Sequence, residues 1–183
     1  MTRAHQIDGR RIDLTVRSGM PRVLSGAAIA RLAAAALEAG GAPAATSLSI
    51  VLTDDAELAE LNIAHLGHAG PTDVLSFPLL PPEAFPVHEG RSAVEESRSV
   101  AGGAPFILPP GAPIHLGDIA VSVERAIAHA LEGRGGQTGD VRWSPANELR
   151  LLVTHGALHV CGWDHGEPVE EAAMRVLERR LLG

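Results

Sequence analysis

The segment from Pro145 to Cys161 constrains the fold more than any other part of the chain, because the helix that it predicts is apolar on almost every side. Its apolar residues recur all around a helix instead of along one stripe: Leu149, Leu151, Leu152, Val153, Ala157, Leu158 and Val160. Such a helix is stable in water only where other elements surround it. We therefore expect 145–161 to lie at the centre of the domain.

Alternating patterns elsewhere predict a small sheet that could cover this helix. Residues 11–17 alternate polar and apolar side chains, as expected of a half-buried strand, and we take them as the first strand of the sheet. Further strands are predicted at 46–53, 73–77 and 116–122, and further helices at 26–39, 56–66, 123–131 and 168–182. Because helices cluster toward the C-terminal end, the order of elements indicates a mixed α/β or α+β class with one sheet covered by helices.

The chain has 183 residues, which suffices for one hydrophobic core of ordinary size, so we expect a single domain over 1–183. Residues 79–113 are rich in proline and glycine and separate two predicted strands. We interpret them as a long irregular loop, either a tolerated insertion or a lid or partner-binding loop. Residues 133–140 form a second glycine-rich linker.

Charge and cysteine content exclude several classes of protein. A formal net charge of −7 argues against binding nucleic acid through a globally basic surface and leaves only a local basic groove. Cys161 is the single cysteine, which excludes an internal disulfide framework, a four-cysteine zinc site and an iron–sulfur cluster held by this chain alone. We find no apolar run long enough for a bilayer and no signal-peptide core at the start. A cytoplasmic protein without a membrane partner is expected.

Three histidines near the end of the central helix predict a metal site. His155 and His159 are four residues apart, so both imidazoles project from one face of a helix and can share one ion. Gly162 follows where a glycine can end the helix and turn the chain back, which would bring His165 to the same ion. Three protein ligands leave one position for water, the arrangement of catalytic zinc.

Two neighbours of these histidines have alternative interpretations. Cys161 points away from the metal face of the helix, so we expect a buried small hydrophobe and not a fourth ligand. Asp164 or a backbone carbonyl could orient the second ring nitrogen of a ligand, although Asp164 could equally be a surface turn residue. The metzincin protease signature has similar spacing, but Gly156 stands where those enzymes have the glutamate that acts as general base. Peptide hydrolysis is therefore kept only as an alternative.

The histidine segment also resembles a known family. The pattern His155-Gly156-x-Leu158-His159-x-x-Gly162-x-Asp164-His165 is similar to the signature of the YbeY family of metal-dependent endoribonucleases, also called rRNA maturation factors. Two further segments agree, Leu61-Asn62 followed by Pro-Thr-Asp-Val-Leu-Ser-Phe-Pro at 71–78, and Leu-Gly-Asp-Ile at 116–119. The agreement runs in order from about residue 46 to the C-terminus and leaves the loop 79–113 unmatched.

The resemblance implies a compact α+β fold, and the elements predicted from the sequence patterns amount to about four strands in one mixed sheet and about five helices. It implies one zinc ion per chain, held by His155, His159 and His165 at the base of a cleft. It also implies hydrolysis of single-stranded RNA, in particular at the 3′ end of small-subunit rRNA, and action on defective ribosomes. The expected partners are then rRNA and the ribosome or small-subunit proteins, and no DNA.

The chain departs from the family pattern at one position of the implied cleft. The family usually carries an arginine five residues before the Pro-Thr-Asp segment, and Leu66 stands there. Leu66 can neither bind phosphate nor stabilise a charged transition state. His68, two residues on, is either a substitute cation or an ordinary loop histidine, so His68 and Asp164 are the only candidates for a catalytic role, and the general base is not assigned.

Several polar residues could contact RNA. Thr72, Asp73 and Ser76 either line the cleft or satisfy backbone groups at the start of a strand, and for Ser76 the structural role is favoured. Arginines available for an RNA-facing patch, each equally a candidate for a solvated surface charge, are Arg125, Arg142 and Arg150.

Two other functions remain open from the sequence. Because of Leu66, the chain could be a non-catalytic ribosome-assembly factor that keeps zinc for structure and binds RNA or a ribosomal protein in its cleft. It could also be a metal-dependent hydrolase of another substrate. A chelator-sensitive ribonuclease activity would separate the endoribonuclease from the assembly factor, and activity on peptides would favour the hydrolase of another substrate.

Overall fold

A computed structural model of the chain describes residues 1–70, 72–91, 113–132 and 143–183. Most of the proline-rich loop (92–112), the linker 133–140 and Arg142 lie outside the described residues, so the predictions for them are not addressed by the structure.

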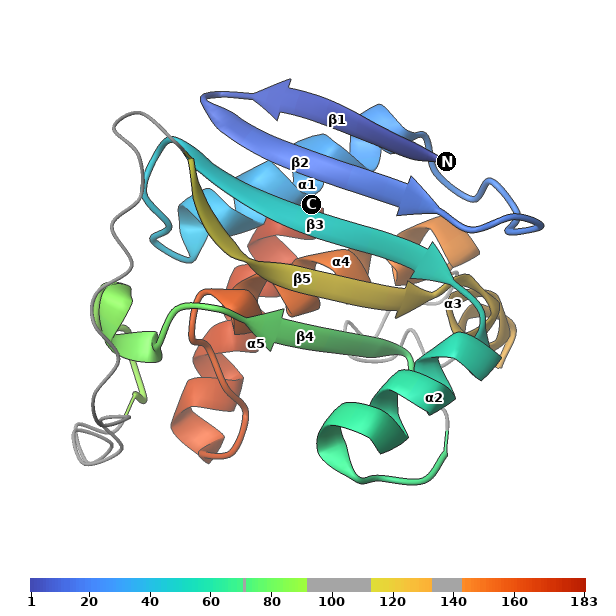
Figure 1. The fold of residues 1–183 in the computed structure, drawn as a ribbon. Helices are drawn as coiled ribbons and strands as arrows, with labels where there is room; N and C mark the ends of the chain where they lie inside the picture. The colour runs from blue at the N-terminus through green and yellow to red at the C-terminus, as the bar shows by residue number, and fades with distance from the viewer. Residues whose placement is uncertain (71, 92–112, 133–142) are drawn as a thin grey trace.

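In the part of the chain that the structure describes, a mixed sheet of five strands forms the frame (Figure 1). The strands are β1 (Thr2–Ile7), β2 (Arg10–Val16), β3 (Thr46–Thr53), β4 (Val74–Pro78) and β5 (Ile114–Ser122), in the order β1-β2-β3-β5-β4. The central pairs β2–β3 and β3–β5 are parallel, whereas the outer pairs β1–β2 and β4–β5 are antiparallel. The α+β class with one mixed sheet is thereby confirmed.

The edge strand β1 was not predicted. Residues 11–17 do form a strand, β2, but their assignment as the first strand of the sheet is wrong. β1 is mostly exposed and carries few apolar residues, so it lacks the alternation that marks a half-buried strand. Its local signal lies in the turn, where Asp8 and Gly9 have φ of 48° and 80°. An Asp-Gly pair with positive φ is typical of a two-residue hairpin, here closed by the pair Ile7 and Arg10.

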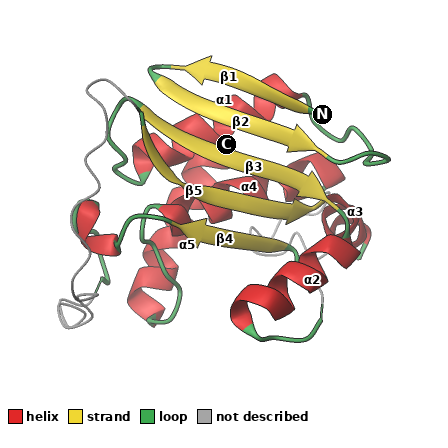
Figure 2. Cartoon of the chain, in the orientation of Figure 1, coloured by secondary structure: helices red, strands yellow, loops and turns green. Residues whose placement is uncertain are grey.

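Five α-helices of the described residues cover the sheet (Figure 2), in agreement with the predicted number. They are α1 (Gly26–Ala39), α2 (Asp55–Leu66), α3 (Val123–Leu131), α4 (Pro145–Val160) and α5 (Pro168–Leu182), and the loop after β4 adds a short 3-10 helix, η1 (Pro82–Ala84). Side chains at the N-cap positions of the first four accept a backbone N–H and so satisfy an otherwise unpaired donor: Ser25, Asp54, Ser122 and Ser144.

Helix α4 occupies the centre of the molecule, as its apolar pattern predicts. Together with α1 it packs on one face of the sheet, and α5 covers its other side through Met174 and Leu177, which contact Leu158. The three helices lie behind the sheet in Figure 1. Helix α2 packs instead on the opposite face, where Leu58 contacts Leu75 of the edge strand β4.

Among the described helices, none combines the length and the apolar character that crossing a membrane requires.

Candidate metal centre

The three histidines that the sequence singles out converge in the structure. His155 and His159 project from the last turns of α4, and Gly162, with φ of 79°, reverses the chain directly after the helix. This turn brings back His165, so that one nitrogen of each ring lies within 4.8 Å of the others. Gly162 is needed here for a second reason, because a Cβ at this position would lie 2.9 Å from Cα of Pro82.

Hydrogen bonds to the outer nitrogens orient the two helical imidazoles. Nδ1–H of His155 donates to Oε1 of Glu178 on α5 over 2.7 Å, and Nδ1–H of His159 donates to the carbonyl oxygen of Trp163, also over 2.7 Å. In a neutral imidazole the other nitrogen then carries a lone pair. Both Nε2 atoms therefore present lone pairs toward the same point.

This donor set fits a metal ion. The two Nε2 atoms lie 3.0 Å apart, and two lone pairs at that distance repel unless a cation lies between them. Nitrogens bound to a tetrahedral zinc ion at 2.0–2.1 Å would be about 3.3 Å apart, close to this spacing. Burial, followed by the neighbouring His155, lowers the pKa of His159 to about 4, so this ring is neutral and free to bind metal near pH 7.

A cleft of about 380 Å³ opens in front of the three histidines. Its other walls come from the end of α2, from β4 and from the segment just before it, namely Leu66, Thr72, Asp73, Val74, Leu75, Ser76 and Pro78. The structure therefore brings Thr72, Asp73 and Ser76 together with the histidines, as the sequence predicts for the cleft. Leu66, which stands at the family arginine position, also lines it and is 54% exposed.

The polar groups of these cleft residues also make local hydrogen bonds. The Thr72 hydroxyl donates to the Val74 carbonyl over 3.2 Å, and Oδ1 of Asp73 accepts the Val74 N–H over 2.9 Å. The Ser76 hydroxyl donates to the carbonyl of Gly156 over 3.2 Å and so ties β4 to α4. The structural role favoured for Ser76 is therefore present, at a position that also faces the cleft.

Gly156, which replaces the protease glutamate, is a packing residue. A Cβ here would lie 2.8 Å from Cγ2 of Ile119 on β5 and 3.2 Å from the Ser76 hydroxyl. No larger side chain fits without moving the helix away from the sheet. The position faces the sheet and not the cleft, so it does not serve as a site for a general base.

The remaining sequence candidates lie elsewhere. His68 is exposed in the loop after α2 and is not among the cleft-lining residues. Asp164 is exposed, and its carboxylate accepts the backbone N–H of His165 over 2.7 Å, whereas the Trp163 carbonyl and Glu178 orient the rings of His159 and His155. Cys161 is fully buried, and burial raises the pKa of its thiol to about 12, as suits a small hydrophobe.

Two arginines of the candidate RNA patch already have protein partners. Nε of Arg125 donates to Oδ2 of Asp55 over 2.9 Å, and Nη2 of Arg150 donates to the carbonyl of Leu182 over 3.0 Å. Neither residue lines the cleft.

Glu178 is the functional residue that the sequence analysis missed. It is buried on α5 and lies four residues after Met174, on the apolar face of that helix. A glutamate in this position is a recognisable signal, because a buried carboxylate needs a partner. Its partner, His155, could be named only once α5 was placed against α4.

The chain is similar to known proteins over most of its length. The sequence matches the family described as Endoribonuclease YbeY over residues 22–183. Proteins of that description include one from Salinispora tropica, 38% identical over 156 residues (85% of this chain, 84% of that protein), and one from Roseiflexus castenholzii, 35% identical over 173 residues (94% and 91%). A third, from Thermobifida fusca, is 34% identical over 171 residues (93% and 91%).

A solved structure is similar as well. The solution structure of a protein from Thermotoga maritima matches with a TM-score of 0.51 and 21% sequence identity, over 94% of this chain and 86% of that one. At this level of identity the likeness concerns the fold alone.

Proposed function

Because this chain belongs to the endoribonuclease YbeY family, a family of metal-dependent hydrolases, we propose that it is a zinc-dependent endoribonuclease specific for single-stranded RNA. The observation that carries the proposal is the convergence of His155, His159 and His165 on one point of an open cleft. We further propose that it matures the 3′ end of small-subunit rRNA and acts on defective ribosomes in the cytoplasm, with rRNA and small-subunit proteins as partners.

The residues of the site have distinct roles in this proposal. His155, His159 and His165 would hold the ion, and Glu178 and the Trp163 carbonyl keep the Nε2 lone pairs of the first two rings directed at it. When bound, zinc lowers the pKa of a coordinated water to about 7 and stabilises charge on a phosphoryl oxygen. Thr72, Asp73 and Ser76 form the wall along which the RNA strand would lie.

Leu66 favours a second candidate function. It places an apolar side chain in the cleft where the family arginine would stand, so the cleft walls contain no arginine among their described residues. A non-catalytic assembly factor would need the metal and the cleft but no cation for the transition state. We keep this as the alternative, to be separated from the enzyme by experiment.

The first experiment incubates purified protein with small-subunit rRNA that carries an unprocessed 3′ end. The wild type and His159→Ala are prepared side by side, with His115→Ala as a matched control, because His115 lies on β5 outside the cleft lining. Cleavage by the wild type and the control alone establishes the metal-dependent nuclease. Absence of cleavage by all three favours the assembly factor, and equal cleavage by all three indicates a contaminating ribonuclease.

Two variants refine the assignment of catalytic residues. Leu66→Arg restores the family cation and is expected to raise the cleavage rate, and an unchanged rate in a folded variant would count against a missing cation. His68→Ala is expected to cleave at the wild-type rate if His68 is an ordinary loop histidine. A large loss of activity would identify His68 as the substitute cation.

Because binding to RNA is electrostatic, the affinity for RNA should weaken as the salt concentration rises.

A further inference from the structure

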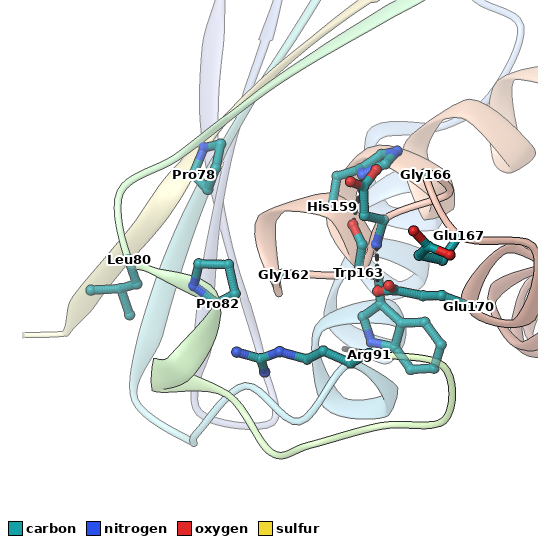
Figure 3. A pocket seen from close by; sticks show the side chains of 11 residues that line it. Pro78, Leu80, Pro82, Arg91, His159, Gly162, Trp163, Gly166, Glu167 and Glu170 are labelled. Carbon is teal, nitrogen blue, oxygen red and sulfur yellow. Dashed lines mark hydrogen bonds between the residues drawn. The ribbon is translucent and has the colours of Figure 1, made fainter. Parts of the chain in front are cut away.

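A second, larger pocket lies against the metal cleft (Figure 3). Its volume is about 680 Å³, and it shares two lining residues with the cleft, Pro78 and the ligand His159. A strand of RNA whose phosphate lies at the histidines therefore has this pocket beside it. A nucleobase is smaller than the pocket, so the space suffices for one base turned away from its neighbours.

Arg91 is the only arginine that lines either hollow in the described part of the chain. Its side chain is 15% exposed and makes two long contacts, from Nη1 to the Phe85 carbonyl at 3.4 Å and from Nη2 to Glu83 at 3.9 Å. A guanidinium has five N–H donors. Among the described residues, most of the donors of Arg91 are therefore available to a ligand in the pocket.

The segment before Arg91 is fixed to the turn that carries His165. The ring of His88 stacks on Trp163 with centroids 3.8 Å apart, and its Nε2 lies 2.7 Å from Oε1 of Glu170. Gly90, with φ of 84°, approaches so closely that a Cβ would lie 2.3 Å from the backbone nitrogen of Glu170. These contacts hold Arg91 at the pocket, while its guanidinium makes only the two long contacts given above within the described part of the chain.

Carboxylates, which accept hydrogen bonds, line the same pocket as Arg91. Glu167 is exposed at the N-cap position of α5 and lines the pocket, and Figure 3 shows it on the side formed by that helix, whereas Arg91 extends toward Pro82. Glu170 is engaged by His88, and the Asp164 carboxylate by the His165 N–H. Three carboxylates around one arginine disfavour a phosphate group. Leu80, Pro82 and Trp163 add apolar surface to the remaining walls, which also include His159.

We propose that this pocket binds one unstacked base of the RNA, beside the nucleotide at the metal centre, and selects guanine or cytosine. The inference rests on the proposed endoribonuclease function. Arg91 would donate to a carbonyl oxygen of the base, and Glu167 would accept from its exocyclic amino group. Guanine and cytosine carry both groups, whereas uracil has no amino group and adenine no carbonyl. A base held in a duplex cannot enter, which accounts for a preference for single strands.

The test uses the zinc-loaded wild type and short uridine oligonucleotides in which one guanosine or cytidine is moved through each position. At one fixed distance from the cut, guanosine or cytidine should raise kcat/KM about tenfold over uridine. Arg91→Ala and Glu167→Gln should each remove this preference. Glutamine at 167 has this effect because its amide both accepts and donates, so it can pair with a carbonyl of uracil as well as with an amino group. Arg175→Ala should keep the preference, because Arg175 lies on α5 outside the pocket and pairs with Glu171.

The outcomes separate this inference from the proposed function. Cleavage with no base preference at any position, or a preference that survives in both pocket variants, overturns the base pocket and leaves the nuclease intact. If Arg91→Ala does not fold, Arg91→Lys and Glu167→Gln provide the test, since lysine lacks the planar fork of arginine. If the wild type cleaves no RNA, the same oligonucleotides are compared by fluorescence anisotropy. Tenfold tighter binding of guanosine or cytidine that Glu167→Gln removes supports the pocket, and equal binding overturns it.

Discussion

His155 and His159 stand on a buried helix, whereas His165 is carried by an exposed turn. The helical pair is oriented by the chain itself, through Glu178 of α5 and the Trp163 carbonyl. The only hydrogen bond at His165 in the described structure is that of its backbone N–H with Asp164. One half of the site is therefore part of the core, and the other half lies at the surface.

The difference shows how contributions to the stability of the fold and to metal binding are divided between the histidines of this site. A histidine in the core makes hydrogen bonds that also stabilise the fold, so its substitution should affect both metal binding and the stability of the protein. A histidine on an exposed turn can be substituted with little effect on the stability of the metal-free protein. The four predictions that follow test this division.

The largest effects are expected from His155→Ala and His165→Ala. Each removes one of the three proposed metal ligands, so RNA cleavage should fall at least about 100-fold in both. That loss is larger than the one expected when a ligand loses only its hydrogen-bond partner. In the metal-free proteins only His155→Ala should lower the free energy of unfolding, by about 1–3 kcal/mol, because it leaves Glu178 buried without its partner. Urea unfolding measures this, and equal stability of the two variants would contradict the division.

The pH dependence of stability should also reflect the buried half. The pKa of His159 falls from 6.5 to about 4 on folding, mainly because the ring is buried. Between these values the unfolded chain binds a proton that the folded chain does not, so lowering the pH from 6.5 to 4 should destabilise the metal-free protein by about 3 kcal/mol through this group. His159→Gln should lack this part of the decrease. Identical pH profiles for the two proteins would show that His159 titrates normally.

Glu178→Gln tests the orienting bond alone. The amide can still accept from Nδ1–H of His155, but it carries no charge, so zinc affinity should weaken about tenfold. Glu171→Gln is the matched control on the same helix, because Glu171 pairs with Arg175 and not with a ligand. Competition with a chelating dye measures both affinities, and equal values would mean that the charge of Glu178 does not act on the site.

The smallest expected effects are the changes in stability caused by substituting two glycines, one in the core and one in the turn. Gly156→Ala places a Cβ 2.8 Å from Cγ2 of Ile119 in the core, and the net destabilisation should be about 1 kcal/mol after the better helix propensity of alanine is included. Gly166→Ala in the turn meets its nearest neighbour, a carboxylate oxygen of Asp164, only at 3.5 Å, and should change stability by less than about 0.5 kcal/mol. A thermal melt of each variant checks the ranking. The comparison would fail if the turn variant were the less stable.

Local features of the fold were predictable because they depend on neighbours in the sequence. The apolar pattern of residues 145–161 was sufficient to place α4 at the centre, and its boundary fell within one residue of the observed end at Val160. The exposed hairpin strand β1 was not predicted, because an edge strand that faces water needs few apolar residues. Its Asp8-Gly9 turn was the signal that could have revealed it.

Arg91 could not have been placed from the sequence. It lies in a proline-rich segment without periodicity, and its position depends on the contact of His88 with Trp163 and Glu170, residues more than 70 positions away in the chain. No local propensity encodes such a contact.

The spacing of His155, His159, Gly162 and His165 was by itself enough to determine that three imidazoles can meet, because the geometry of a helix sets the angle between residues four apart and a glycine permits the turn. Only the tertiary structure decided which ring nitrogens face the shared point, which walls form the cleft and which pocket adjoins it. Those features depend on the packing of α5, β4 and the loop after it against α4, and packing between distant segments follows from the path of the whole chain.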